Sequence, residues 1–121
     1  MTRSLVIKCT TGTDENVERA SQAFTVAVTA ATAGAPVSVW LTGDAVWLAV
    51  PGRAEDVVLE GGAPFAELRD AVLALGSLTV CTQCAMRRKL EQSDLIEGVR
   101  IAGAPTFVEE ALAEGAQALI Y

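Results

Sequence analysis

The sequence has 121 residues, which is long enough for one domain with a buried core and too short for two, so we expect a single domain over residues 1–121. Its formal net charge of −6 argues against a general nucleic-acid-binding protein, because such proteins carry a basic surface. Hydrophobic residues make up 51% of the chain, a share that buried parallel strands and contacts between subunits would both explain.

The first residues do not have the pattern of an export signal. The apolar run Leu5–Ile7 is short and Lys8 interrupts it. The longest weakly polar stretch, Ala23–Ala33, is too short to cross a bilayer and contains threonines. We therefore expect a cytoplasmic protein with no membrane partner, in which the three cysteines stay reduced.

Short apolar runs alternate with helical patterns along the chain. Strands are expected at residues 4–9, 37–41, 78–81 and 117–121, with a weaker one at 99–102. Helices are expected at residues 14–33, from 64 to 75, directly after Cys81, and from 106 to 115. The glycines that follow three of these helices, Gly34, Gly76 and Gly115, are expected to adopt left-handed cap conformations. The alternation predicts an α/β fold, with a parallel sheet and helices on both of its faces.

The ends of two helices have recognisable capping residues. Thr13 or Asp14 is a suitable N-cap for the first helix, whose apolar stripe includes Phe24 and Ala27. Thr106 and Glu109 have the spacing of a capping box, which places the start of the last helix at Thr106.

The segment Ala45–Val50 contains Trp47 and is apolar on every side. A short helix of this kind has to be buried on more than one side. It packs either under a loop of its own chain or against a second subunit. The second interpretation is slightly favoured, because so small a domain has little interior left for Trp47.

Polar residues follow three of the expected strands. The segments are Cys9–Asp14, Thr42–Asp44 and Cys81–Cys84. Because ligands bind outside the carboxyl ends of parallel strands, we expect the three segments to converge on one crevice. Candidate residues there for binding a substrate or an anion are Thr10, Thr11, Gly12 and Asp44.

Cys81 and Cys84 form a Cys-x-x-Cys motif between a strand and a helix that contains Arg87 and Arg88. Backbone N–H groups at a helix start and nearby guanidinium groups both favour a thiolate, so Cys81 is the candidate nucleophile. Cys84 lies one turn further on and would hydrogen-bond Cys81 or form a disulfide with it. The alternative is that both thiols pack as small apolar side chains and that the arginines form a solvated helix face. Cys9 is expected to belong to the core.

Metal binding and a thioredoxin-like role are two other uses that proteins make of such cysteines. Structural zinc needs four protein ligands, whereas this chain has three cysteines and no histidine, so we expect no metal and no cofactor. Cys-x-x-Cys after a strand is also typical of thiol–disulfide oxidoreductases. In thioredoxin the motif follows an early strand, but here it lies two-thirds of the way along the chain.

Two stretches of sequence carry a family resemblance. The first is Val80-Cys81-x-x-Cys84-Ala85-x-x-Arg88, then Leu90 and Asp94-Leu95-Ile96-x-Gly98-Val99. The second is Ala102-Gly103-Ala104-Pro105-Thr106-Phe107-Val108, with the closing Gly115-Ala116-Gln117. Together they resemble the DsrE/DsrF-like family of small sulfur-relay proteins. The resemblance covers most of the chain and is most specific from Val80 onward.

The resemblance implies a three-layer α/β/α fold around a mainly parallel sheet of about five strands, assembled as trimers or hexamers. It also implies that Cys81 carries sulfur as a persulfide, with Arg87 and Arg88 at the family's usual offset from it. Lys89 departs from the family, where glycine is common, and Cys84 is missing from its best-known sulfur carriers.

These observations together favour a cytoplasmic, homo-oligomeric sulfur carrier or sulfurtransferase. Cys81 would accept sulfur, Cys84 would assist or resolve it, and Arg87 or Arg88 would stabilise the anion. Its partners would be sulfur donor and acceptor proteins. The alternatives are a thiol–disulfide oxidoreductase that uses Cys81 and Cys84, and a non-catalytic oligomeric binding subunit.

Overall fold

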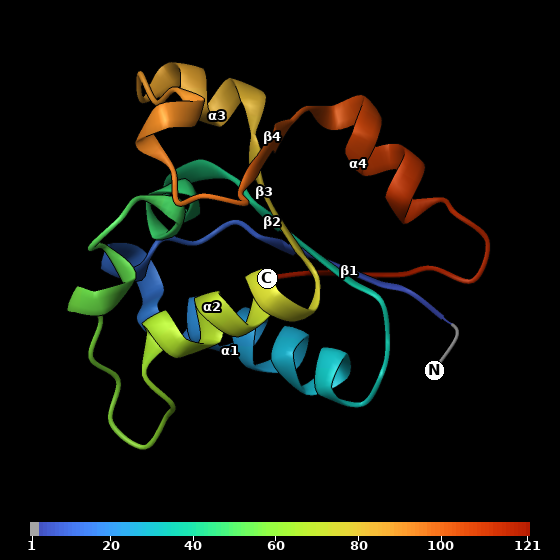
Figure 1. The fold of residues 1–121 in the computed structure, drawn as a ribbon, viewed down its shortest axis with the longest axis horizontal. Coiled ribbons are helices and arrows are strands. Elements are labelled where there is room, and N and C mark those ends of the chain that lie inside the picture. The colour runs from blue at the N-terminus through green and yellow to red at the C-terminus, as the bar shows by residue number, and fades with distance from the viewer. Residues whose placement is uncertain (1–2) are drawn as a thin grey trace.

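The computed structural model describes residues 3–121, and its centre is a five-stranded sheet (Figure 1). The strands are β1 (Leu5–Cys9), β2 (Val37–Leu41), β3 (Ser77–Cys81), β4 (Arg100–Ala102) and β5 (Gln117–Ile120). Their order in the sheet is β4-β3-β2-β1-β5, and every neighbouring pair is parallel. The predicted sheet is therefore confirmed, including its weaker strand after Val99.

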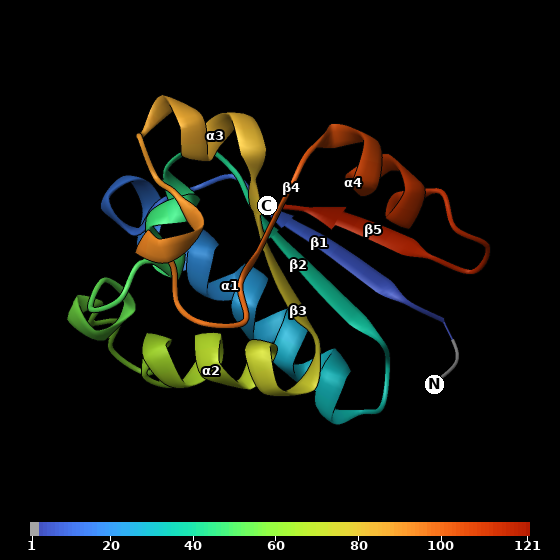
Figure 2. The ribbon, with the colours of Figure 1, turned by 45° about the horizontal axis from the view of Figure 1, so that its top comes forward.

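Helices cover both faces of the sheet, as Figure 2 shows. The helices α1 (Thr13–Thr32) and α2 (Phe65–Leu75) lie together on one face, and α4 (Ala104–Ala111) lies on the other. The short α3 (Thr82–Arg87) follows β3 at its carboxyl end, and 3₁₀-helices occupy Gly43–Ala49, Ala54–Asp56 and Gln92–Asp94. This is the expected three-layer α/β/α arrangement. Within residues 3–121, no helix is both long and apolar enough to cross a membrane.

The apolar core lies between the sheet and the helices α1 and α2. Side chains alternate along a strand, so Ile7, Val39 and Leu78 point into this core. Phe24 of α1 and Phe65 of α2 meet there, with their ring centroids 4.9 Å apart. The same alternation directs the side chains next to them in sequence, among them Lys8, Trp40 and Thr79, towards α4.

The face under α4 is held mainly by polar interactions. The carboxylate of Glu110 accepts hydrogen bonds from Ser38 Oγ at 2.5 Å, Trp40 Nε1 at 3.0 Å and Arg100 Nη2 at 2.6 Å. Burial alone would raise the pKa of Glu110, but these donors hold it below its usual value. Phe107 adds an edge-on contact to Trp40, with ring centroids 5.4 Å apart. No residue of α4 is fully buried, so these contacts are what attaches the helix to the sheet.

Both predicted helix caps were wrong. The N-cap of α1 is Gly12, and its N–H donates to the Glu15 carboxylate at 2.8 Å. The N-cap of α4 is Gly103, so that helix begins before the predicted capping box and has Pro105 in its first turn. Proline suits this position because its missing N–H would have no partner there and its fixed φ is helical.

The three glycines after helices differ in their conformations. Gly34 and Gly115 have φ of +98° and +79°, so their left-handed conformation is confirmed. Gly76 has φ of −146°, so the prediction of a left-handed cap was wrong there. It is needed for a different reason: a Cβ at this position would lie 2.4 Å from the Val37 carbonyl oxygen.

The structure corrects our interpretation of the apolar segment around Trp47. Ala45, Val46, Leu48 and Ala49 are buried in the core of their own chain. Trp47 is half-buried, and the guanidinium carbon of Arg53 lies 4.6 Å from the centroid of its ring system. A second subunit is therefore not required to cover this segment.

Replacing Gly76 with alanine should destabilise the fold, because the new Cβ has to displace backbone rather than a flexible side chain. We expect Gly76→Ala to lower the free energy of unfolding by ~1–3 kcal/mol in urea denaturation. Gly62→Ala is the matched control, since the nearest atom to its added Cβ is 3.7 Å away. Equal stability of the two variants would contradict the steric argument.

Candidate functional site

The connection between β3 and α3 contains no loop. Cys81 is the last residue of β3 and also the N-cap of α3, with an extended backbone at φ −64° and ψ 129°. Cys84 lies within the first turn of α3, and the two cysteines come within 3.6 Å of each other. Cys81 is half-buried, whereas Cys84 is only 7% exposed. A reagent from solvent therefore meets Cys81 first.

The surroundings of Cys81 favour its thiolate. Burial raises the pKa of the Cys81 thiol, but the backbone N–H and side chain of Cys84, the backbone N–H of Gln83 and the charge of Lys8 together lower it below the ordinary value. Hydrogen bonds and positive charge stabilise the ionised form of a thiol more than its neutral form. A larger fraction of Cys81 is therefore nucleophilic near neutral pH.

Sequence reasoning did not identify Lys8 as a site residue. Lys8 pairs with Trp40 in the sheet, and Trp40 pairs with Thr79, two positions before Cys81. The Lys8 ammonium lies 4.5 Å from the centroid of the Phe107 ring, on the α4 side of the sheet. The proximity of Lys8 to Cys81 depends on the order of the strands, which no local sequence pattern reveals.

Cys84 is held by the loop that follows β2. The N–H of Gly43 donates to Cys84 Sγ at 3.2 Å. Gly43 has φ of +56°, and a Cβ on it would lie 3.3 Å from the Thr10 carbonyl oxygen, so a side chain there would be both strained and crowded. The backbone of this loop therefore supplies a donor directly to the second sulfur of the motif.

Arg88 joins α3 to the same loop. Its Nε and Nη2 donate to Asp44 Oδ1 at 2.9 and 2.7 Å, and its Nη1 donates to the Cys84 carbonyl at 3.1 Å. The guanidinium is thus already paired with a carboxylate. Arg87, in contrast, is exposed, and within residues 3–121 its side chain makes no hydrogen bond or ion pair.

The predicted residues of the first loop lie in different surroundings. Gly12 packs tightly against Asp44, since a Cβ on Gly12 would lie 2.8 Å from Asp44 Cβ. Thr10 Oγ1 donates to the Tyr121 carbonyl at 2.6 Å, and Thr11 is buried. The structure therefore brings the three polar segments together around Asp44, while the hydroxyl of Thr10 is directed to the end of the chain.

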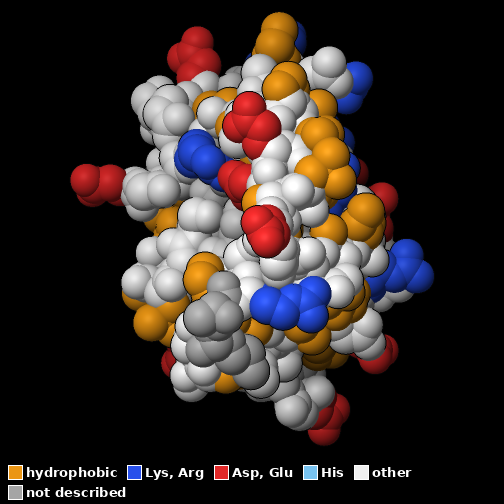
Figure 3. All heavy atoms as spheres, turned by 90° about the vertical axis from the view of Figure 1, so that its right-hand side faces the viewer, with side chains coloured by type: hydrophobic (Ala, Val, Ile, Leu, Met, Phe, Trp, Pro, Cys, Tyr) orange, Lys and Arg blue, Asp and Glu red, His pale blue; other side chains and the backbone are white. Residues whose placement is uncertain are grey.

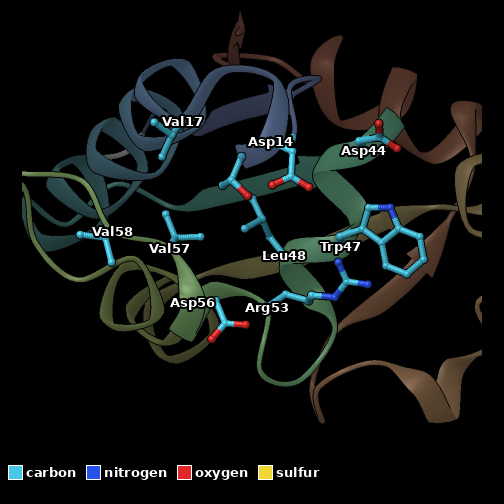
Figure 4. Close-up of a pocket in the computed structure, with 11 residues that line it drawn as sticks. Asp14, Val17, Asp44, Trp47, Leu48, Arg53, Asp56, Val57 and Val58 are labelled. Carbon is cyan, nitrogen blue, oxygen red and sulfur yellow. The ribbon is translucent and has the colours of Figure 1, made fainter.

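A cavity of about 430 Å³ opens on the α1 side of Asp44 (Figure 4). Three carboxylates, from Asp14, Asp44 and Asp56, contribute to its lining, together with Arg53 and the ring of Trp47. Neither Cys81 nor Cys84 lines it. Its excess of negative charge is unfavourable for an anionic sulfur species.

Cys9 belongs to the core, as expected. Its side chain is fully buried, and its Sγ donates to the Thr11 carbonyl at 3.5 Å. Burial raises the pKa of the Cys9 thiol, which outweighs the opposing effect of the backbone at Thr11. Cys9 therefore remains a neutral, protected thiol.

Comparison with known proteins identifies similarities in sequence and in fold. The sequence profile of the DsrE/DsrF-like family matches residues 5–119. Among curated proteins, none matches the sequence significantly. Three solved structures share the fold: the YchN protein from E. coli, MTH1491 from Methanobacterium thermoautotrophicum and BT1422 from Bacteroides thetaiotaomicron.

The structural matches span nearly whole chains. YchN superposes with a TM-score of 0.81 at 17% identity, covering 98% of this chain and 99% of its own. MTH1491 gives a TM-score of 0.71 at 11% identity with the same coverage, and BT1422 gives 0.60 at 15% identity, covering 96% of this chain and 94% of its own. At these identities the similarity supports the fold alone.

The three thiols should differ in their reactivity. We expect iodoacetamide at pH 7 to modify Cys81 first, Cys84 more slowly and Cys9 only after unfolding, because the three differ in exposure and because Cys81 has the lowered pKa. Mass spectrometry of tryptic peptides at timed intervals measures the three rates. The unfolded protein in urea is the control, in which the rates should converge. Equal rates in the native protein would contradict this assignment.

Proposed function

We propose a function from one established premise: this chain belongs to the DsrE/DsrF-like family. The protein acts as a sulfur carrier or sulfurtransferase, and Cys81 carries the sulfur as a persulfide. The observation that supports this most directly is the position of Cys81, half-buried at the start of α3 with a lowered pKa. Such a thiol is accessible and ionises more readily than an ordinary cysteine, which suits a sulfur acceptor.

The reaction needs no external oxidant or reductant. The Cys81 thiolate attacks the terminal sulfur of a donor persulfide and forms a new S–S bond, while the donor S–S bond breaks and its electron pair leaves with the donor thiolate. Transfer to an acceptor thiolate repeats the step in the opposite direction. The anionic persulfide on Cys81 is stabilised by the same N–H groups that lower the pKa of the thiol.

The other predicted site residues have distinct roles in this proposal. Cys84 lies close enough to Cys81 to hydrogen-bond its sulfur. Its thiolate can also attack Cys81 Sγ, which expels the outer sulfur as hydrosulfide and leaves a Cys81–Cys84 disulfide; in that route an external thiol has to reduce the disulfide. Arg88 positions α3 through Asp44, and the exposed Arg87 provides positive charge towards an approaching donor or acceptor protein. In the first loop, Gly12 packs against Asp44 and so limits its position, while Thr10 and Thr11 support the loop itself.

A thiol–disulfide oxidoreductase is the second candidate function. The separation of 3.6 Å between Cys81 and Cys84 favours it, because the pair needs little movement to close a disulfide. The Gly43 N–H at Cys84 Sγ would stabilise the thiolate that reduction releases. In this case the pair would cycle against a partner dithiol at a potential comparable to the roughly −270 mV of thioredoxin.

Incubation with a persulfide donor should add one sulfur atom to the protein, and tryptic mapping should place it on Cys81. We expect Cys81→Ser to abolish the adduct, Cys84→Ser to retain or prolong it, and Cys9→Ser to change nothing. Intact mass spectrometry before and after dithiothreitol measures the adduct and its reversibility.

The same experiment separates the two candidate functions. A Cys84→Ser protein that gains no sulfur on Cys81, beside a wild-type protein that loses two hydrogens within the Cys81–Cys84 peptide, would overturn sulfur carriage and favour the oxidoreductase. Failure of the protein to react in either way would favour a non-catalytic binding subunit.

We also propose that the protein works as a cytoplasmic homo-oligomer, a trimer or a hexamer. Large apolar side chains remain exposed on α4 and β5, with Val108 49%, Leu112 80% and Ile120 65% exposed. Figure 3 shows hydrophobic side chains gathered in a band along one side of the molecule. β5 is also an edge strand, and an uncovered edge invites pairing or cover by another chain.

Sedimentation equilibrium at micromolar concentration should therefore give the mass of a trimer or a hexamer of the 12.6 kDa chain. Leu112→Glu should weaken the assembly, because a charge would lose its water at the contact. Val58→Glu is the control, since Val58 is equally exposed but lies in the segment between Ala54–Asp56 and α2. A monomer of the native protein would contradict the proposal.

A further inference from the structure

Lys8 is a half-buried cation without a carboxylate partner among residues 3–121. The ion pairs of the described chain involve Arg69, Arg88 and Arg100. The Lys8 ammonium lies over the face of the Phe107 ring, 4.5 Å from the ring centroid. A cation that is partly removed from water is stabilised by a nearby anion, and here the protein itself supplies no carboxylate for that purpose.

The charges that lie beside Lys8 on this face of the sheet, Arg100 and Glu110, are paired with each other. Arg100 donates from Nη2 to Glu110 and from Nε to Thr79 Oγ1 at 2.8 Å. The Glu110 carboxylate is fully engaged by its three donors. Among the described residues of the sheet, Lys8 is therefore the half-buried cation on the α4 side that has no carboxylate partner.

Lys8 also lies on the same face as the reactive thiol. Alternation along β3 directs Thr79 and Cys81 to the α4 side, and Lys8 is in register with Thr79 through Trp40. Its charge is close enough to lower the pKa of Cys81, which agrees with this placement. The uncompensated cation and the nucleophile thus lie on the same face of the sheet, on strands β1 and β3 with β2 between them.

We propose that Lys8 and Cys81 together form an anion-binding site on the α4 side, which takes a small anionic sulfur donor whose charged group lies a few bonds from the reacting sulfur. The ammonium holds the charged group of the donor while the thiolate attacks the sulfur. The identity of the ligand as a sulfur donor rests on the proposed function, but the preference for an anion does not.

The opposite side of the sheet disfavours the same ligand. The cavity beside α1 is lined by Asp14, Asp44 and Asp56 against Arg53. Asp44 is paired with Arg88, so the carboxylates of Asp14 and Asp56 are what makes this cavity less favourable for an anion. An anionic donor is therefore directed to the α4 side by attraction at Lys8 and by repulsion on the α1 side. During transfer the thiolate forms one S–S bond, the donor S–S bond breaks, the leaving group departs with the electron pair, and Lys8 keeps its proton.

The test compares two alkylating probes on the whole protein, anionic iodoacetate and neutral iodoacetamide. In both reactions the Cys81 thiolate displaces iodide, so a change in the fraction of thiolate alters both rates equally. The ratio of the two rates at Cys81 therefore measures the local electrostatic potential. We expect Lys8→Gln to reduce the iodoacetate-to-iodoacetamide ratio by about 3- to 10-fold at low ionic strength, as removal of one nearby charge implies. Lys8→Arg should retain most of the ratio.

Arg19→Gln is the matched control, because it removes one positive charge from an exposed position on α1. Its ratio should stay within about twofold of the wild-type value. Raising the salt concentration should bring the wild-type ratio towards that of Lys8→Gln. A ratio that Lys8→Gln leaves unchanged in the folded protein would overturn the anion site, because salt alone also screens the exposed Arg87. A clear ratio effect without any persulfide on Cys81 would leave the anion site standing and overturn the proposed function.

Discussion

The direct passage of β3 into α3 is the constraint on which the arrangement of this site depends. Cys81 is held on one side by the sheet, where it pairs with Ala102, and on the other by the first turn of a helix. The strand fixes the direction of its side chain, and the helix places N–H groups around the sulfur. An inserted loop residue would separate these two effects, since the thiol would then leave either the sheet register or the helix start.

The carboxyl end of the sheet has opposite electrostatic character on its two sides. Asp44 stands between them: it lines the acidic cavity next to α1 and also receives Arg88 from α3. Lys8 and the start of α4 lie on the other side, with the half-buried Cys81. At this end of the domain an approaching anion is therefore favoured on the α4 side, although the net charge of the whole chain is −6.

The features that sequence predicted well were those set by local periodicity. Strands such as Val37–Leu41 and the long α1 bury a regular apolar pattern, and the Cys-x-x-Cys motif can be recognised from the sequence alone. The start of α4 was missed because Pro105 and the Thr106–Glu109 spacing are competing local signals, of which proline prevailed. Gly76 and Lys8 were misread for a common reason. Their roles depend on Val37 and Cys81, which are distant in sequence and become neighbours only through the strand order.

The weak attachment of α4 affects access to the Cys81 thiol. This helix buries no residue completely and is held by hydrogen bonds to Glu110 and by the edge of one aromatic ring, whereas α1 buries Phe24 and several alanines. Elements with few buried apolar contacts open at the lowest free-energy cost. Because the pKa of Glu110 is lowered in the folded protein, its stabilising contribution is complete above about pH 4.3, its unfolded value, and is lost as the pH falls through the folded value. Acid therefore weakens the attachment of α4, the helix that covers the sheet on the side of Cys81.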